Sequence, residues 1–215
     1  MDYEDWEPFY LQIIEDFGFS READEKVAAE LDRLLGGTRV SADELRSVFR
    51  GEVVTVAGNG ASLARDLKDA EGVLVTADEA TTVALEQGLH PAVLVTDLDG
   101  KVEDQLRANA DGTIAVVHGH GDNGPAVRTW ARHFTGRTLA TTQSRPSGRL
   151  VNFGGFTDGD RAVCLADHLG AREIRLAGWD FEHPSPKDGD AKLKQRKLDW
   201  AYIVIQNLDR PELEI

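Results

Sequence analysis

The sequence predicts an α/β protein with a doubly wound, mostly parallel sheet and helices on both faces, preceded by an N-terminal helical segment. From residue 52 onward, short runs of Val, Ile and Leu alternate with amphipathic stretches. Strands that are apolar along their whole length are typical of parallel sheets covered by helices on both faces. With 215 residues, of which 41% are hydrophobic, the chain has enough apolar material for one α/β core.

Residues 1–50 are predicted to form a helical segment ahead of a nucleotide-binding α/β domain over 51–215. Large apolar side chains recur at helical spacing near the start of the chain: Trp6, Phe9, Ile13 and Phe17. Ser20 is placed to cap a second helix that ends at the paired glycines 36–37, and Ser41 precedes a third short helix. We expect no catalytic group in this segment.

The α/β domain is predicted to contain six strands and the helices that connect them. The strands are expected at 52–57, 72–77, 92–96, 113–118, 138–142 and 173–177. The helices are expected at 62–68, 79–87, 102–110, 124–134 and 160–169, with a last helix over 187–208. A helix between consecutive strands is the crossover that parallel pairing requires.

The chain carries 38 acidic and 24 basic side chains, which gives a formal net charge of −14. Nucleic acids and anionic membranes attract basic surfaces, so we expect neither as a partner. No apolar run approaches the roughly 18–20 residues that cross a bilayer. The first residues are acidic where a secretory signal is basic, and the lone Cys164 suits a reducing compartment, so we predict a cytoplasmic protein. The sequence leaves a homo-oligomer open.

The kind of charge is as informative as its sign. Arg outnumbers Lys by 17 to 7, and Asp outnumbers Glu by 22 to 16. An acidic, lysine-poor surface keeps a protein soluble in concentrated salt, where screening removes the repulsion between its charges. We interpret the composition as that of a halophilic protein; an ordinary acidic cytoplasmic protein is the alternative.

Polar motifs follow five of the predicted strands at the point where each strand ends. In an open parallel sheet, ligands bind beyond the carboxyl ends of the strands. The first motif, Gly58-Asn59-Gly60-x-Ser62, joins a strand to a helix start, where exposed amides favour an anion such as phosphate. It lacks the Lys-Ser/Thr pair of a P-loop, and a tight turn without a ligand is the alternative.

Carboxylates follow four of these strands. Asp97 and Asp99, directly after an apolar strand, can converge on one hard cation, and Asp122 after the next strand can be a third ligand. Mg²⁺ prefers such oxygen ligands together with substrate phosphates. An Asx-rich turn is the alternative. Asp78 and Asp180 follow two further strands and are candidate contacts for the ligand.

His118, His120 and Asn123 lie in one motif with Asp122. The two histidines have a spacing that zinc ligands can use. No cysteine accompanies them, and the glycines at 119 and 121 favour close approach of the backbone to a ligand. We therefore favour histidines that contact phosphate or form a turn, with Asn123 beside them.

A further motif, with acidic and basic residues, lies at the start of the helix expected at 160–169. Asp158 is either the helix cap or a ligand, and Asp160 in the first turn can face the cleft. Arg161, which we count among the catalytic residues, can bind phosphate. Three of the seven lysines fall within six positions: Lys192, Lys194 and Lys197. They indicate either a solvated helix face or a positive lid over a polyphosphate.

Together these motifs resemble the archaeal 6-hydroxymethyl-7,8-dihydropterin pyrophosphokinase family, which is distantly similar in its core to thiamin pyrophosphokinases. The resemblance starts near residue 53, extends to the C-terminal helix and rests on the order of five motifs: Gly-Asn-Gly-x-Ser at 58–62, Val-Thr-Asp-Leu-Asp-Gly at 95–100, His-x-His-Gly-Asp-Asn at 118–123, Phe-Thr-Asp-Gly-Asp-Arg-Ala at 156–162 and Gly-Trp-Asp-Phe at 178–181. One departure stands at Asp78-Glu79-Ala80, where the family often has Asp-Gly-Ala.

The resemblance implies ATP- and Mg²⁺-dependent transfer of a diphosphate to the hydroxymethyl oxygen of the dihydropterin, with release of AMP, in folate or tetrahydromethanopterin biosynthesis. It implies that Asp97 and Asp99 bind Mg²⁺ with Asp122 as a third acidic contributor, and that the first and fourth motifs line the cleft. Asp97 or Asp122 is the candidate base for the hydroxyl proton. Asp180 or Asn59 is the candidate partner of the amino-pyrimidinone edge of the pterin.

Two other functions remain open on the sequence. One is a metal-dependent glycosyltransferase-like enzyme that uses an Asp-x-Asp motif on a nucleotide sugar. The other is a non-catalytic nucleotide-binding module, with the N-terminal helices as its partner surface. In the favoured function the partners are small molecules, ATP and the dihydropterin.

Overall fold

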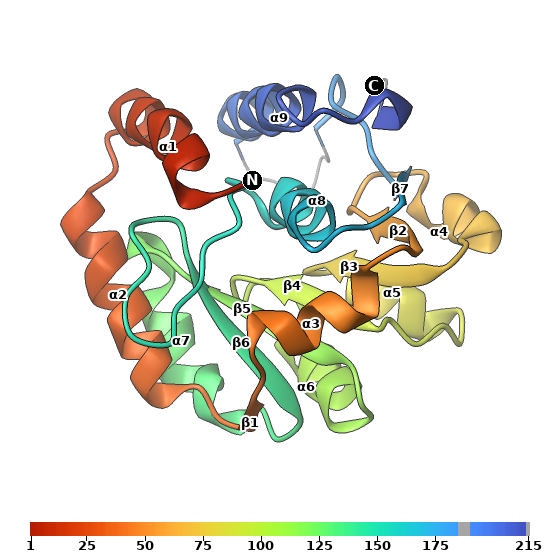
Figure 1. The fold of residues 1–215 in the computed structure, drawn as a ribbon, viewed down its shortest axis with the longest axis horizontal. Coiled ribbons are helices and arrows are strands. Elements are labelled where there is room, and N and C mark those ends of the chain that lie inside the picture. Colours follow the sequence, from red (N-terminus) through yellow and green to blue (C-terminus); the bar gives the residue numbers. More distant parts are fainter. Residues whose placement is uncertain (185–189, 214–215) are drawn as a thin grey trace.

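The computed structural model describes residues 1–184 and 190–213. Within these ranges, a seven-stranded and entirely parallel sheet forms the centre of the molecule (Figure 1). Its strands are β1 (Thr38–Arg39), β2 (Val53–Ala57), β3 (Val73–Ala77), β4 (Val93–Thr96), β5 (Ile114–Gly119), β6 (Arg137–Thr142) and β7 (Glu173–Ala177). They lie in the order β1-β6-β5-β4-β3-β2-β7. The predicted α/β fold is confirmed, and all six predicted strands are present with small shifts at their ends.

The seventh strand, β1, has no counterpart in the prediction. It is two residues long and pairs with β6 at one edge of the sheet, Thr38 with Arg137 and Arg39 with Thr138. Two residues are too few to carry a strand periodicity, so no pattern marks them in the sequence.

Nine α-helices surround the sheet in the part of the chain that the structure describes. They are α1 (Tyr3–Phe17), α2 (Arg21–Leu34), α3 (Ala42–Phe49), α4 (Leu63–Asp66), α5 (Ala80–Glu86), α6 (Val102–Ala110), α7 (Gly124–Trp130), α8 (Asp158–His168) and α9 (Ala191–Gln206). The helix expected at 124–134 ends at Trp130 and continues as a 3₁₀ turn. The helix expected at 160 already begins at Asp158. Positions 187–189 of the expected last helix lie outside the described residues, and α9 begins at Ala191.

The sheet is doubly wound. From β2 to β6, each new strand is added on the same side of the one before. Because parallel crossovers are right-handed, α4 to α7 lie on one face, where Leu94 and Val117 pack beneath α6 and α7. The chain then returns through α8 over the other face, where Val56 and Val95 are buried, to reach β7 beside β2. The direction of winding therefore reverses between β2 and β7.

The N-terminal helices complete both faces of this sheet. α1 lies beside α8 and α9 (Figure 1), and its Trp6, Tyr10 and Ile13 are buried in the core on that face. α2 packs on the opposite face against β5, β6 and α7. Its approach to β5 is close, because a Cβ at Gly119 would lie 2.9 Å from the Ala28 Cα.

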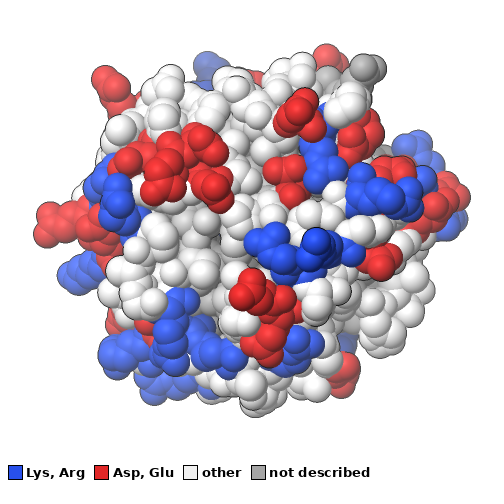
Figure 2. All heavy atoms as spheres, in the orientation of Figure 1, with Lys and Arg blue, Asp and Glu red and all other residues white. Residues whose placement is uncertain are grey.

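Among the described residues, we find no helix that combines the length and the apolar character needed to cross a membrane. Acidic and basic side chains lie in small groups among uncharged residues on the face shown in Figure 2. Charges of both signs are therefore dispersed over this face.

Candidate active site

A cavity of about 430 Å³ lies at the carboxyl ends of the strands. Its lining follows six neighbouring strands: Trp179 comes after β7, Gly58 after β2, Asp78 after β3, Asp97 after β4, His120 after β5 and Gln143 after β6. Helices α8 and α9 contribute further residues, and Phe19 comes from the turn between α1 and α2. The polar motifs of five strands therefore meet in one cavity.

A larger cavity of about 740 Å³ adjoins the first one between β7 and α9. The two share Trp179 and Asp180, and the larger one is also lined by Phe181, Tyr202 and Ile203. Its lining includes none of the carboxylates after β3 and β4. The smaller cavity is therefore the one at the predicted site.

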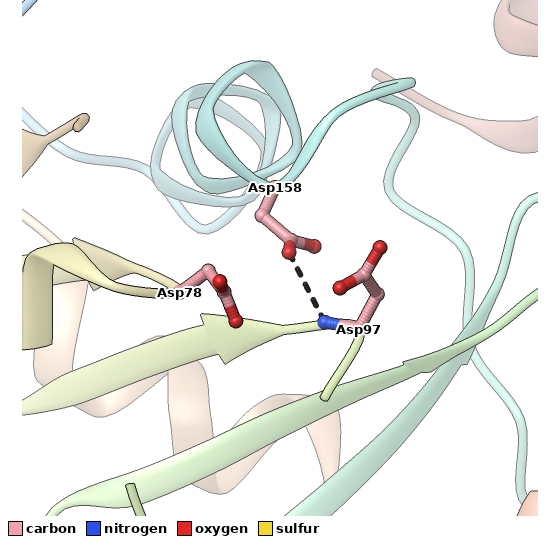
Figure 3. Close-up of side chains that lie close together, drawn as sticks. All are labelled: Asp78, Asp97 and Asp158. Carbon is pink, nitrogen blue, oxygen red and sulfur yellow. Dashed lines mark hydrogen bonds between the residues drawn. The ribbon is translucent and has the colours of Figure 1, made fainter. Parts of the chain in front are cut away.

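Three carboxylates converge in the smaller cavity. Asp78, Asp97 and Asp158 each offer an oxygen atom, and these atoms lie within 4.8 Å of one another. The backbone N–H of Asp97 donates to Asp158 Oδ2 at 3.0 Å, which ties the first turn of α8 to the end of β4 (Figure 3). We call these three residues the acidic triad.

The charges of the acidic triad are strongly perturbed. Burial, together with the charges of Asp158 and Asp97, raises the pKa of Asp78 to about 8. Burial and the charge of Asp97 raise the pKa of Asp158 to about 7. Burial also opposes ionisation of Asp97, but the hydrogen bond and charge of His120, together with the charges of Arg161 and Lys197, outweigh it and lower the pKa of that carboxyl. A divalent cation would remove the mutual repulsion of the three, and their oxygen atoms are the hard ligands that Mg²⁺ prefers.

The backbone around Asp78 is shaped to bring its carboxylate to this point. Asp78 has a φ of 45°, in the left-handed region that side chains other than glycine rarely adopt. Thr96 Oγ1 and Gln105 Nε2 each donate to Asp78 Oδ1 at 2.8 Å. Gly100 lets its loop approach, because a Cβ there would lie 3.0 Å from Asp78 Oδ2. A strained residue held by several contacts is typical of a functional position.

Basic side chains surround the acidic triad. The Arg161 guanidinium donates to Asp158 Oδ1 at 2.8 Å and to the Phe156 carbonyl at 3.0 Å, and it is almost fully buried. His120 Nε2 lies 3.2 Å from Asp97 Oδ2. Lys194 and Lys197 of α9 line the same cavity. Carboxylates and cations are thus interleaved around one space, which suits a polyphosphate bound with its metal.

A family model described as 6-hydroxymethylpterin diphosphokinase MptE-like matches residues 29–185. The chain belongs to this MptE-like family. The family resemblance inferred from the motifs is therefore confirmed.

Curated relatives cover most or all of the MptE-like chain. A 6-hydroxymethyl-7,8-dihydropterin pyrophosphokinase from Methanothermobacter thermautotrophicus is 43% identical, over 98% of this chain and 96% of the relative. Proteins with the same name from Pyrococcus furiosus and Methanocaldococcus jannaschii are 40% and 33% identical, over 84% and 100% of this chain and 79% and 99% of their own lengths. Among solved structures, MAf glycosyltransferase from Magnetospirillum magneticum AMB-1 matches 86% of this chain and 35% of its own, with 18% identity and a TM-score of 0.47. A likeness this weak carries no argument about activity.

In this MptE-like protein, the expected metal ligands Asp99 and Asp122 lie outside the acidic triad. Both are exposed residues at the cavity lining. Asp99 Oδ1 accepts a hydrogen bond from the Gly100 backbone N–H at 2.7 Å. Leu98 has a left-handed φ of 70°, so the chain leaves the extended conformation and Asp99 does not continue the alternation of β4. Asp97 is instead joined by carboxylates from β3 and α8.

Two other predicted site residues hold local structure and are absent from the cavity lining. Ser62 Oγ donates to Asp66 Oδ2 at 2.6 Å, beside the start of α4. The Asp160 carboxylate accepts from the backbone N–H groups of Phe156 and Thr157 at 2.6 and 2.7 Å, and with Thr157 it forms the capping box of α8. Thr157 is the N-cap of this helix, which leaves Asp158 to join the triad.

Of the other predicted site residues in the histidine motif, one lies in the cavity lining and two lie in the surrounding structure. His120 lines the cavity, whereas His118 is buried with its Nδ1 2.9 Å from Thr141 Oγ1. Asn123 Nδ2 donates to the carbonyls of Asp97 and His118, at 2.7 and 2.8 Å. Asn123 therefore holds together the ends of β4 and β5, with no place in the lining.

The remaining predicted residues lie at the β2 and β7 end of the cavity and on α9. Gly58, Gly60 and Asn59 line the cavity, and Asn59 Nδ2 donates to Glu79 Oε2 at 2.8 Å. Asp180 also lines it, and its Oδ1 accepts from the backbone N–H of His183 at 2.9 Å. Lys194 lines the cavity, whereas Lys192 is exposed and does not.

Residues of the first 50 contribute more to the site than the sequence indicates. Phe19 lines the cavity, and Asp24 is 2% exposed. Asp24 Oδ1 accepts from the Gly121 backbone N–H at 2.7 Å, and Oδ2 accepts from Tyr10 Oη at 2.8 Å and Gln143 Nε2 at 2.7 Å. The sequence does contain one signal for Asp24, a charged residue at a position of the apolar helix face. This face of α2 also buries Val27, Ala28 and Leu31.

Proposed function

We propose that the protein transfers the terminal diphosphate of ATP to the hydroxymethyl oxygen of 6-hydroxymethyl-7,8-dihydropterin and releases AMP. The observation that carries this proposal is the nearly full-length match to the Methanothermobacter relative, which bears the name of that pyrophosphokinase. The two further relatives bear the same name, which favours diphosphate transfer over transfer of a sugar from a nucleotide. The cavity supports it, since carboxylates and cations surround one space.

The proposed metal ligands are Asp78, Asp97 and Asp158. Their support is the convergence of three carboxylate oxygens and the raised pKa of two of them. A bound Mg²⁺ would neutralise the phosphate oxygens and the charge that develops on them during transfer. Of the three metal ligands expected from the motifs, this set retains Asp97. Asp78 and Asp158 take the places of Asp99 and Asp122.

The protein's own side chains would orient the reacting groups. The Arg161 guanidinium fixes Asp158 through its 2.8 Å hydrogen bond, and His120 fixes Asp97. The two cavity-lining lysines of α9 bring positive charge toward the phosphates. Positioning and neutralisation of charge account for most of the catalysis in phosphoryl transfer.

We further propose that the enzyme works in the cytoplasm of a halophile, on small molecules alone. The lone Cys164, the net charge of −14 and the excess of Arg over Lys support these proposals. The homo-oligomer that the sequence leaves open stays a prediction.

The test of the proposed site is the rate of AMP release from ATP and the dihydropterin as Mg²⁺ is varied. Asp97→Asn should lower the rate by orders of magnitude at every Mg²⁺ concentration, because the amide lacks the charge that a cation requires. Asp111→Asn is the matched control, since Asp111 is exposed at the end of α6 and should leave the rate unchanged. An Asp97→Asn enzyme with the normal rate and Mg²⁺ dependence would overturn the proposed metal site.

A further inference from the structure

The active-site cavity has two ends with the acidic triad between them. The strand order puts Gly58 and Trp179, after β2 and β7, at one end, and His120 and Gln143, after β5 and β6, at the other. Asp78 and Asp97, after β3 and β4, lie between the two ends. Neighbouring strands are about 4.8 Å apart, so the ends are separated by several strand spacings. Both substrates of the proposed reaction carry a flat fused ring, and each end offers an aromatic surface.

The end at β2 and β7 suits the nucleotide. Ligands of doubly wound sheets bind where the direction of winding reverses, and here that point lies between β2 and β7. The backbone approaches closely there, because a Cβ at Gly60 would lie 2.6 Å from the Gly178 carbonyl oxygen. Trp179 is fixed beside it by a hydrogen bond from its Nε1 to the Val56 carbonyl at 3.0 Å. Diphosphate transfer requires donor and acceptor in line on opposite sides of the transferred phosphorus, so the acceptor belongs at the other end.

The other end carries a preformed aromatic wall, because Phe19 leads into α2, which packs against β5 and β6. Phe19 and Phe156 both line the cavity, with ring centroids 6.4 Å apart. Phe17 packs behind them, with its centroid 5.3 Å from that of Phe19 and 5.1 Å from that of Phe156. Three mutually packed rings hold their orientation without a ligand, which reduces the entropy lost when a flat ring stacks on them.

Gln143, which follows β6, supplies an oriented polar group at the same end of the cavity. It is 4% exposed and lines the cavity, and its Nε2 donates to Asp24 at 2.7 Å. This bond fixes the orientation of the amide at the cavity lining. A carbonyl oxygen is the acceptor that the N–H donors on a pterin edge need.

We propose that Phe19 and Phe156, with Gln143 at the same end of the cavity, form the subsite for the pterin ring, while the nucleotide occupies the end at β2 and β7. The inference rests on the proposed function, because the acceptor's ring is known only through it. Phe19 and Asp24 lie before the residues 29–185 that the family model matches. The N-terminal segment thereby selects the acceptor, a role that no motif in the sequence indicates.

The test compares Phe19→Leu with the wild-type protein. Loss of one stacking surface should raise the KM for the dihydropterin by about 10- to 100-fold and change the KM for ATP by less than about twofold. Tyr202→Leu is the matched control, because Tyr202 lines only the larger cavity, and neither KM should change. A raised KM for ATP in Phe19→Leu, or an unchanged KM for the dihydropterin, would overturn the subsite.

Equilibrium binding separates this inference from the proposed reaction. The probe is 6-hydroxymethylpterin, added without ATP so that no transfer can occur, and its binding is followed by its fluorescence. Phe19→Leu, checked for folding by circular dichroism, should bind the probe about 10- to 100-fold more weakly and ATP with unchanged affinity. If the wild-type protein makes no AMP but the probe shows this difference, the reaction fails and the subsite stands. Equal binding of the probe by both proteins contradicts the subsite whatever the reaction.

Discussion

Asp24 joins helix α2 to the active-site cavity through a buried carboxylate, and its removal should lower both stability and activity. Its two oxygen atoms accept three hydrogen bonds of 2.7–2.8 Å from Tyr10, Gln143 and Gly121. Asp24→Ala leaves three donors without a partner in a site that is 2% exposed. Each unpaired buried donor costs about 1–3 kcal/mol, and because such losses do not add fully, we expect a loss of about 3–5 kcal/mol.

Asp24→Asn should cause only part of this loss of stability. An asparagine whose oxygen replaces Oδ2 keeps the bonds from Tyr10 and Gln143, but its NH₂ group then faces the Gly121 N–H. One bond is lost, so we expect about 2 kcal/mol. For a chain of this length, 1 kcal/mol shifts the thermal midpoint by about 2–4 °C. The expected decreases are therefore about 4–8 °C for Asp24→Asn and at least about 6 °C for Asp24→Ala.

The assay is thermal unfolding followed by circular dichroism, with AMP release measured on the same samples. Glu22→Gln is the matched control, since Glu22 is exposed on the same helix and its midpoint should move by less than about 2 °C. Because Gly121 is adjacent to His120, which contacts Asp97, we also expect Asp24→Asn to lower kcat about tenfold. Midpoints of both Asp24 variants within 2 °C of the wild type would refute the role given to these hydrogen bonds.

Three further measurements test the fold and its electrostatics. Gly119→Ala puts a Cβ 2.9 Å from the Ala28 Cα, so chemical denaturation should show a loss of about 1–3 kcal/mol; an unchanged midpoint would mean that α2 is not packed this closely. Burial and the charge of Arg161 hold the pKa of His118 well below its usual value, so it is neutral when folded and gains a proton only on unfolding below about pH 6.5. This histidine alone lowers stability as the pH drops, so the stability of the wild type relative to His118→Gln should fall between pH 7.5 and 5; an equal slope in both proteins would contradict the buried neutral histidine. With a net charge of −14, the wild-type midpoint should rise between dilute buffer and molar KCl, and a constant midpoint would count against halophilic adaptation.

The strands of the fold could be predicted because they are buried on both faces. Continuous apolar runs such as 93–96 need no knowledge of their partners to be recognised. Strand β1 could not be found in this way, since its pairing with β6 depends on where α2 and α3 carry the chain. The early start of α8 follows from a capping box centred on Thr157, which shifts the first turn by two residues.

Strand ends located much of the site, and the motifs on the later helices added Asp158, Arg161 and Lys194. Asp78 and Asp97 lie at the expected edge because parallel strands bring their carboxyl ends together. Asp158 lies beside them because α8 crosses back over the sheet. The spacing of residues in the sequence does not reveal that the start of α8 comes close to the ends of β3 and β4. The Asp-x-Asp spacing suggested that both carboxylates lie on one side of an extended chain. The left-handed φ of Leu98 ends the extended conformation, so Asp99 does not lie beside Asp97 in this way. Phe19 reaches the cavity only through the packing of α1 against α8 and α9, which is a tertiary effect.

The reaction we propose moves the β- and γ-phosphates of ATP together to one oxygen atom of the dihydropterin. Its most direct measurement uses ATP labelled at the β-phosphorus, with Mg²⁺ and 6-hydroxymethyl-7,8-dihydropterin, and follows both nucleotide and pterin products. We expect one AMP for each dihydropterin consumed, with the label on the pterin product. Release of ADP, or AMP with the label left off the pterin, would contradict diphosphate transfer by this protein.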